Sequence, residues 1–416
     1  MERYSEYKDS GVKWLGEIPS HWEVRKIIGS FSENKKKNTN FTFTRAMQFN
    51  YGTIVDKNEG FDTTEAKSIY CNYALINRGD IVINGLNLNY DFISQRVAIS
   101  PKDGIITSAY VIVSPRENMN PYYFCYLFKD MDNMKMFHGM GTGVRKTLSF
   151  KELRNQLIPI PTLEEQDAIV RYLDAATSKI DKAIAMQQKM IDLLNERKQI
   201  IIQNAVTKGL DENVEMKDSG VEWTEFFPNS WSIKKVKYIF EFISTKEVTS
   251  NRTFNIALEN IVAHSGNYID TNSEYESAGI SFQENDILFG KLRPYLAKVY
   301  LCECKGIALG DIFVLRPKSG FDSRFLRYLL ISDRFIKYVD SSTYGAKMPR
   351  TNWGFMGNIC IAYPNLDEQK KIANYLDKQM QRFDSAITNC QRQITLLQER
   401  KQIIINEVVT GKVKVS

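Results

Sequence analysis

The longest repeated stretch in this sequence reads LEEQDAIVRYLDAATSKIDKAIAMQQKMIDLLNERKQIIIQNAVT, at residues 163–207. A second stretch, LDEQKKIANYLDKQMQRFDSAITNCQRQITLLQERKQIIINEVVT at residues 366–410, aligns with it without gaps, and 23 of the 45 aligned positions are identical. The longest shared block is Glu-Arg-Lys-Gln-Ile-Ile-Ile, at residues 196–202 and 399–405. Chance does not produce such a match, so the chain contains an internal duplication. The fold is therefore expected to consist of two copies of one structural plan.

Both repeated stretches are predicted to be long helices, because apolar residues recur at a spacing close to 3.5 and neither stretch contains proline or an internal glycine. The predicted seam consists of Val170, Leu173, Thr177, Ile180, Ile184, Gln187, Ile191, Leu194, Lys198, Ile201 and Ala205 in the first stretch, and of Ala373, Leu376, Met380, Phe383, Ile387, Cys390, Ile394, Leu397, Lys401, Ile404 and Val408 in the second. A helix of about 45 residues is roughly 68 Å long. A single helix of that length would expose its seam, so the two are predicted to pair with each other. The alternative is that each packs only on its own domain.

Each predicted helix begins with a helix-start signal. Thr162 precedes the first helix with Glu165 three residues on, and Asn365 precedes the second with Glu368 three residues on. Both are predicted to be capping boxes, in which the cap side chain and the carboxylate satisfy backbone amides reciprocally. The prolines at positions 161 and 364 end the preceding segments.

A second pair of matched segments precedes the two predicted helices. Residues 8–14 read Lys-Asp-Ser-Gly-Val-Lys-Trp, and residues 217–223 read Lys-Asp-Ser-Gly-Val-Glu-Trp. Pro19 and Trp22 follow the first segment at the spacing at which Pro228 and Trp231 follow the second. Between these starts and the helices the two halves diverge. A duplicated scaffold that carries two different bodies suggests two related readers of different targets; the alternative is simple duplication with drift.

The two bodies, residues 15–160 and 224–363, are predicted to be mixed α/β domains. Short β-branched or aromatic runs such as Ile81-Val82-Ile83 alternate with turn residues, and short helices are predicted at Pro121–Asp130 and Ser323–Ser332. The helices carry 13 basic and 13 acidic residues together, so the net charge of +6 lies outside them, mainly in the bodies.

Several loops of the bodies combine cations with hydroxyls, amides or aromatic rings. These loops are 35–38, 141–147, 291–295 and 344–352. Such mixtures suit DNA, because cations contact phosphates while Arg, Asn and Gln read base edges; the alternative for each is an ordinary solvated loop. The candidate DNA-contacting residues are Lys35, Lys36, Lys37, Arg145, Lys146, Lys291, Arg293, Lys347 and Arg350.

Catalytic and metal-binding motifs are weak or missing in this sequence. Asn120-Pro121-Tyr122-Tyr123 lacks the second proline of the N-P-P-Y motif of amino-methyltransferases, and Asp286 with Glu303 and Lys305 fits a nuclease pattern that is common by chance. The six cysteines form no C-x-x-C pair. No apolar run approaches the roughly 20 residues of a membrane span. We therefore expect a cytoplasmic, non-catalytic protein without metal or cofactor of its own.

The opening Asp9–Trp22 and its copy Asp218–Trp223, together with Pro161–Gln166 and its copy Pro364–Gln369, resemble the scaffold motifs of specificity subunits of type I restriction-modification systems. The resemblance covers essentially the whole chain. It implies two target recognition domains, each reading one half of a split, asymmetric DNA site. It also implies that the two long helices form an antiparallel coiled coil that sets the spacer between the half-sites.

The same resemblance implies the partners. Two modification subunits would bind S-adenosylmethionine and methylate adenine, and restriction subunits would add cleavage that depends on ATP and Mg²⁺. The base-reading residues of this family follow no motif, so none is transferred to this chain. The alternative from another class is a coiled-coil scaffold or adaptor that binds only proteins.

We therefore expect an α+β chain with a pseudo-twofold internal repeat, in which the two recognition domains are joined by the paired helices. The expected segments are residues 1–161 (first recognition domain), 162–208 (central spacer helix), 209–364 (second recognition domain) and 365–416 (C-terminal spacer helix). Double-stranded DNA is the expected ligand, and no membrane association is expected.

Overall fold

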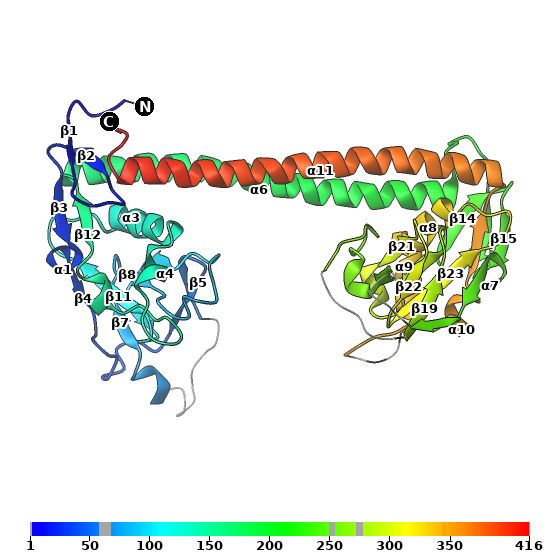
Figure 1. Cartoon of the computed structure of the whole chain (residues 1–416), viewed down its shortest axis with the longest axis horizontal. Coiled ribbons are helices and arrows are strands. Elements are labelled where there is room, and N and C mark those ends of the chain that lie inside the picture. Colours follow the sequence, from blue (N-terminus) through cyan, green and yellow to red (C-terminus); the bar gives the residue numbers. More distant parts are fainter. Residues whose placement is uncertain are drawn as a thin grey trace. The chain divides into compact units, whose positions relative to one another are not determined.

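The computed structural model describes residues 2–57, 68–248, 254–271, 278–343, 345 and 347–415. The chain divides into two units. Unit 1 combines Met1–Gln187 with Arg392–Ser416, and unit 2 is Gln188–Gln391. The long helices α6 (Leu163–Lys208) and α11 (Leu366–Val409) each contribute one part to each unit. Each compact unit therefore contains one body together with a part of both long helices (Figure 1).

The body of unit 1 is built on a four-stranded antiparallel sheet with the strand order β4-β11-β8-β9. Smaller two-stranded pairs, β1-β2, β3-β12, β5-β6 and β7-β10, surround it. The strands are β1 (Tyr7–Asp9), β2 (Glu17–Pro19), β3 (Glu23–Lys26), β4 (Phe31–Glu33), β5 (Met47–Asn50), β6 (Thr53–Asp56), β7 (Ala74–Ile76), β8 (Ile81–Ile83), β9 (Val97–Ile99), β10 (Gly104–Ile106), β11 (Val111–Pro115) and β12 (Leu157–Ile160). The body's helices are α1 (Ile27–Ser30), α3 (Pro121–Asn133), α4 (Met136–Met140) and α5 (Phe150–Leu153).

The body of unit 2 repeats this plan, with a four-stranded antiparallel sheet in the order β16-β23-β20-β21. A second four-stranded sheet has the order β17-β19-β22-β18. The strands are β13 (Met216–Val221), β14 (Thr224–Pro228), β15 (Ser232–Lys235), β16 (Phe240–Ile243), β17 (Lys246–Val248), β18 (Asn255–Ile256), β19 (Ala278–Phe282), β20 (Ile287–Gly290), β21 (Val299–Leu301), β22 (Gly306–Ala308), β23 (Ile312–Pro317) and β24 (Cys360–Tyr363). The helices are α7 (Val236–Ile239), α8 (Ser323–Ile331), α9 (Asp333–Ser341) and α10 (Trp353–Met356), with 3₁₀ turns at Leu258–Asn260 and Pro294–Leu296. The predicted fold class and internal repeat are confirmed.

One inner strand of each main sheet, β8 in unit 1 and β20 in unit 2, is apolar on both faces. In β8, Ile81 and Ile83 pack in the core that contains α3, whereas Val82 lies in a separate cluster with Ala74 and Ile106. In β20, Ile287, Phe289 and Leu288 divide in the same way between two clusters. Because successive side chains of a strand point to opposite faces, a strand covered on both sides needs an uninterrupted apolar run.

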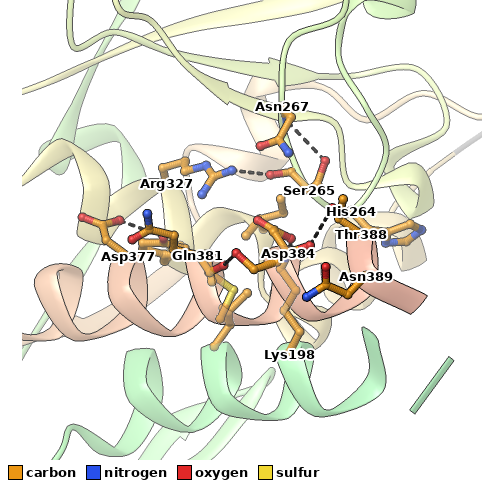
Figure 2. Close-up of a pocket in the computed structure, with 15 residues that line it drawn as sticks. Lys198, His264, Ser265, Asn267, Arg327, Asp377, Gln381, Asp384, Thr388 and Asn389 are labelled. Atoms are coloured by element: carbon orange, nitrogen blue, oxygen red, sulfur yellow. Dashed lines mark hydrogen bonds and ion pairs between the residues drawn. The ribbon is translucent and has the colours of Figure 1, made fainter. Parts of the chain in front are cut away.

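The two long helices pair with each other in both units. In unit 1, Val170 and Leu173 of α6 share a core with Val408 of α11, and Lys401 Nζ lies 2.7 Å from Asp181 Oδ1. In unit 2, the later part of α6 and the earlier part of α11 share a core, and Lys198 Nζ lies 2.6 Å from Asp384 Oδ1 (Figure 2). The start of one helix therefore meets the end of the other, so the predicted antiparallel pairing is confirmed. Every predicted seam residue is buried or half-buried.

The matched motifs that lie far apart in the sequence meet at the helix starts. Trp22 Nε1 donates to Glu165 Oε1 at 3.2 Å, and Trp231 Nε1 donates to Glu368 Oε1 at 3.0 Å. Glu165 also completes the predicted capping box with Thr162. At the second helix, the Asn365 side chain caps the backbone N–H of Glu368 at 3.0 Å. The two halves of each repeat are thus joined by the same tryptophan–glutamate hydrogen bond.

Candidate nucleic-acid interface

In unit 1, the loop that contains Arg145 and Lys146 pairs with the connection between β8 and β9. The backbone N–H of Leu148 donates to Gly85 O at 2.9 Å, and that of Leu88 donates to Lys146 O at 3.1 Å. The approach is so close that a Cβ atom on Gly85 would lie 2.3 Å from the carbonyl oxygen of Leu148. Glycine is therefore needed where the two loops meet.

The tip of this loop is a tight turn. Backbone hydrogen bonds in both directions join Thr142 to Thr147, at 3.1 and 2.9 Å. Gly143 inside the turn has a φ of 77°, in the region that glycine adopts at no cost. Arg145 and Lys146 are exposed, and within the described part of the chain neither forms an ion pair. The turn therefore presents two cations to solvent.

In unit 2, two candidate loops that are separated in the sequence form one site. The backbone N–H of Thr351 donates to Lys291 O at 3.0 Å, and that of Arg293 donates to Pro349 O at 2.8 Å. The hydrogen bond from Thr351 to Lys291 corresponds to the one in unit 1 that joins the backbone N–H of Leu148 to Gly85 O. Arg293 and Lys347 are exposed. Tyr344 and Ala346, which belong to the predicted loop 344–352, lie outside the described residues.

Two of the candidate cations in unit 2 are bound to the same carboxylate. Arg350 donates from Nε and Nη2 to Asp311 Oδ2 at 3.1 and 2.8 Å, and Lys291 Nζ lies 3.5 Å from Asp311 Oδ1. The hydrogen bonds from Arg350, helped by the charges of Arg350 and Lys291, hold the pKa of Asp311 below its usual value. Asp311 therefore partly neutralises Arg350 and Lys291, so these two cations have less positive charge to offer a phosphate than Arg293 and Lys347 have.

The third candidate group, Lys35, Lys36 and Lys37, follows strand β4. Lys35 Nζ lies 2.8 Å from Glu33 Oε2, and Lys37 forms a backbone bridge to Ala74 at the start of β7. All three lysine side chains are exposed. This group lies on a different segment from the loop pair, and its role in DNA binding stays a prediction, like that of the other candidates.

Sequence reasoning missed the connection between β8 and β9, residues 84–96, because cations are sparse in it. Its aromatic and apolar residues are unusually exposed: Tyr90 by 76%, Phe92 by 54% and Ile93 by 95%. The only signal in the sequence was the mixture of asparagine with an aromatic residue in Asn87-Leu88-Asn89-Tyr90, between two predicted strands. The structure places this connection directly beside Arg145 and Lys146.

The two weak catalytic matches have structural roles. The Asp286 carboxylate is 1% exposed and accepts hydrogen bonds from Arg316 Nε and Nη2, both at 2.9 Å. The Asn120 side chain caps α3 by accepting from the backbone N–H of Tyr122 at 2.9 Å. Among the described residues, no group of three or more His, Cys, Asp or Glu residues is placed to hold a metal ion. No helix in the described ranges combines the length and apolar character needed to cross a membrane.

Each unit also contains a crevice between its body and the paired helices. In unit 2 the crevice has a volume of about 610 Å³ (Figure 2), and in unit 1 about 840 Å³. The same repeated residues line both crevices: Lys198, Asp384, Asp377 and Tyr328 in unit 2, and Lys401, Asp181, Asp174 and Tyr126 in unit 1. In both, the tyrosine hydroxyl donates to the aspartate, at 2.8 Å from Tyr328 and 2.7 Å from Tyr126.

Comparison with known families accounts for the repeat. The family described as the type I restriction modification DNA specificity domain matches this chain twice, at residues 19–190 and 228–398. Together the two matches cover most of the sequence, so the chain belongs to this family. It is a DNA sequence-recognition subunit, and the alternative of a scaffold that binds only proteins is not favoured.

Relatives span the full length of the chain. The type I restriction enzyme MjaVIII specificity subunit of Methanocaldococcus jannaschii is 24% identical, over 98% of this chain and 97% of the relative. The putative MjaX specificity subunit of the same organism is 25% identical, over 98% of both chains. Specificity subunits of this kind are non-catalytic recognition components.

Solved structures share the fold. A chain from a study of complex assembly and conformational transition of the type I R-M system superimposes with a TM-score of 0.72 at 13% identity, covering 95% of this chain and 99% of its own length. The HsdS subunit of Thermoanaerobacter tengcongensis superimposes with a TM-score of 0.53 at 15% identity, covering 95% of this chain and 98% of its own. These structures share the predicted fold, and the family match confirms the predicted family and the role in DNA sequence recognition.

Proposed function

We propose that each body of this chain reads one half of a split, asymmetric DNA site and that the helix pair sets the spacer between the halves. The observation that carries this proposal is a repeated frame with different loops. The main sheet has the same strand order in both units. However, the connection beside the basic loop spans 13 residues, 84–96, in unit 1 and 8 residues, 291–298, in unit 2. Different loops on one frame read different base sequences.

We further propose that two modification subunits bind this chain, one to each repeat. Each repeat exposes the same apolar residues on its helix: Leu193 and Ile200 are 50% and 51% exposed, and their counterparts Leu396 and Ile403 are 53% and 56% exposed. The crevices beside the helices are duplicated as well. Two equivalent surfaces suit two copies of one partner.

The chemistry belongs to the partners in this proposal. The modification subunits bind S-adenosylmethionine and methylate adenine, and restriction subunits use ATP and Mg²⁺ to translocate and cleave DNA. In this proposal the chain itself binds no cofactor and determines which DNA sequence the partners act on. Because its substrate would be cellular DNA, we place the complex in the cytoplasm.

Methylation-sensitive sequencing tests the proposal. Host DNA is compared between cells that carry the modification subunit with this chain and cells that carry the modification subunit alone. We expect methylated adenines at one bipartite sequence only when this chain is present. A chimera in which residues 224–363 are replaced by the body of another family member serves as the matched control, and it should change one half-site only.

Two results would contradict the proposal. One is a methylation pattern that does not depend on this chain. The other is a chimera in which both half-sites change, because the two bodies would then not read independently. If the isolated chain shows no salt-dependent binding to DNA, a scaffold whose partners are proteins is favoured instead.

A further inference from the structure

The connection between β8 and β9 in unit 1 is held in one conformation by a buried arginine. Arg96 is 3% exposed. Its guanidinium donates to the carbonyl oxygens of Leu86 at 2.8 Å and Asp91 at 2.7 Å. Its own backbone N–H donates to Asp132 Oδ2 on α3 at 2.7 Å. A buried charge that bonds two carbonyls of one loop fixes the path of that loop.

A second set of contacts fixes the end of the same connection. Asp91 Oδ1 accepts the backbone N–H groups of Ser94 and Ile93, both at 3.0 Å. These backbone hydrogen bonds lower the pKa of Asp91 to about 2. The Phe92 ring stacks on His138, with centroids 4.7 Å apart, and His138 Nε2 donates to Asp91 O at 3.0 Å. The turn is thereby locked in a form that projects Ile93 outward.

The locked turn and the neighbouring basic loop together expose an apolar surface. We call Tyr90, Phe92, Ile93 and Val144 the apolar tip. Ile93 and Val144 are 95% and 96% exposed. Asn89 Nδ2 donates to Val144 O at 3.5 Å, which joins the two loops. Single exposed apolar residues are ordinary on protein surfaces, but here the backbone that carries Ile93 is fixed by hydrogen bonds while the Ile93 side chain stays almost fully exposed.

The charge beside the apolar tip indicates its partner. Arg145 and Lys146 follow Val144 directly, are exposed, and lack ion-pair partners among the described residues. In the major groove, cations reach phosphates and guanine, while the 5-methyl group of thymine is the apolar feature of the base edges. An apolar tip flanked by free cations has the chemistry of that groove.

We propose that the apolar tip packs on thymine methyl groups in the major groove, so that the half-site read by the body of unit 1 contains A·T pairs recognised through the methyl group. This inference rests on the proposed function and names the base feature that one body reads. The 8-residue connection of unit 2 is not the counterpart of this tip in length or sequence. The apolar tip is therefore expected to act on one half-site only, since the apolar side chains exposed in the loops of unit 2 are different ones, Tyr295 and Met348.

Deoxyuridine provides the probe, because it lacks the 5-methyl group and keeps the other base-edge groups of thymine. Each thymine of the site mapped by methylation sequencing is replaced singly, and binding of the full-length chain is measured at fixed salt. We expect at least one replacement, in one half-site, to weaken binding about fourfold, the effect of about 0.8 kcal/mol for one buried methyl-sized group.

A protein variant tests whether the apolar tip causes the discrimination between thymine and deoxyuridine. The double variant Ile93→Ser/Val144→Ser should bind the thymine and deoxyuridine duplexes equally, while deoxyuridine effects in the other half-site stay as in the wild type. Both side chains are almost fully exposed, so the thermal unfolding curve should not change. Met186→Ser, at a residue 72% exposed on α6, is the matched control and should keep the wild-type discrimination.

The proposal is overturned if no replacement of thymine by deoxyuridine, in either half-site, weakens binding. It is equally overturned if the double variant keeps the wild-type ratio of affinities for the thymine and deoxyuridine duplexes. It is also overturned if the double variant loses a co-purifying modification subunit while the ratio stays, because the tip would then contact protein. Failure of the proposed function looks different: the wild-type chain would not prefer the mapped duplex over a scrambled one.

Discussion

Asp130 is a buried carboxyl group that links the body of unit 1 to the end of α11. It is 2% exposed, and Asn406 Nδ2 donates to its Oδ2 at 2.8 Å. Burial raises its pKa to about 6, although the hydrogen bond from Asn406 and the charge of Lys412 oppose the shift. The folded protein therefore favours the protonated form of Asp130 more than the unfolded chain does.

This pKa predicts a pH dependence of stability. The ordinary aspartate pKa of 3.8 applies to the unfolded chain, so between about pH 4 and pH 6 the folded state binds more protons, and the free energy of unfolding falls as pH rises. The fall amounts to at most about 3 kcal/mol from this group. Asp130→Asn keeps an acceptor for Asn406 without the charge. We expect the variant to be more stable than the wild type at pH 7.5 and similar near pH 4, in urea unfolding.

An Asp130→Asn variant that is less stable than the wild type at pH 7.5 would contradict this account. It would mean that the ionised carboxylate contributes more through Lys412 than its burial costs. Lys412→Ala measured at the same two pH values separates the two contributions, because it removes the cation whose charge opposes the pKa shift of Asp130.

The exposed cations of unit 1 predict a salt dependence. Arg145→Ala/Lys146→Ala should weaken DNA binding and reduce the slope of log K against log salt by about 0.9 for each lost phosphate contact. Lys347→Ala/Arg350→Ala should reduce the slope less, because Arg350 is already paired with Asp311. Fluorescence anisotropy at several salt concentrations measures both slopes.

Lys179→Ala/Lys182→Ala is the matched control, because both lysines are exposed on α6, outside the loops. It should leave the slope unchanged. If the Arg145→Ala/Lys146→Ala variant keeps both the wild-type affinity and the wild-type slope, this loop does not contact DNA.

At the scale of the elements, the helix pair repeats one ion pair in two environments. Asp181 with Lys401 and Asp384 with Lys198 are the same positions of the duplicated sequence. The Lys198 side chain is only 10% exposed, whereas that of Lys401 is 30% exposed. The body of unit 2 therefore covers its lysine more completely than the body of unit 1 covers its own.

This difference predicts unequal effects of equivalent substitutions. Asp384→Ala leaves the nearly buried Lys198 without its partner and should lower stability by about 1–3 kcal/mol. Asp181→Ala leaves a more exposed lysine and should cost less than about 1 kcal/mol. Chemical unfolding of the two variants compares them directly. Equal effects would show that the exposure of the lysine does not decide the strength of the pair.

At the scale of the whole molecule, the proposed role of the helix pair predicts how the DNA site responds to helix length. Insertion of three heptads between Lys189 and Met190 and between Arg392 and Gln393 keeps the seam in phase and changes only exposed positions. Insertion nearer the end of α6 would disrupt packing, because Ala205 and Val206 lie in the core of unit 2.

Three heptads add about 32 Å to each helix, close to one turn of DNA at about 34 Å. The spacer should therefore lengthen by about nine base pairs while both half-site sequences stay the same. Methylation mapping of cells that carry the lengthened chain and the modification subunit measures both. Altered half-site bases with an unchanged spacer would show that the helices do not set the distance.

The features that follow local patterns were predictable from the sequence. The repeat, the long helices and the seam from Val170 to Ala205 depend on periodicity within one segment, and the structure buries or half-buries each seam residue. The cap at Thr162 is local as well. Family membership followed from scaffold motifs, because the residues that join a body to its helices are the ones that the repeat retains.

Only the tertiary structure decided which distant residues meet. It pairs Lys291 with Thr351, ties Arg350 to Asp311, and brings the loop 84–96 beside Arg145. It also shows why tryptophan and glutamate recur together in both repeats. These contacts depend on strand order, register and the path of the connecting chain, which bring together residues far apart in the sequence. No local pattern of charge or hydropathy encodes such partners. The charge of a loop could therefore be predicted from the sequence, but the residues that lie beside the loop in space could not.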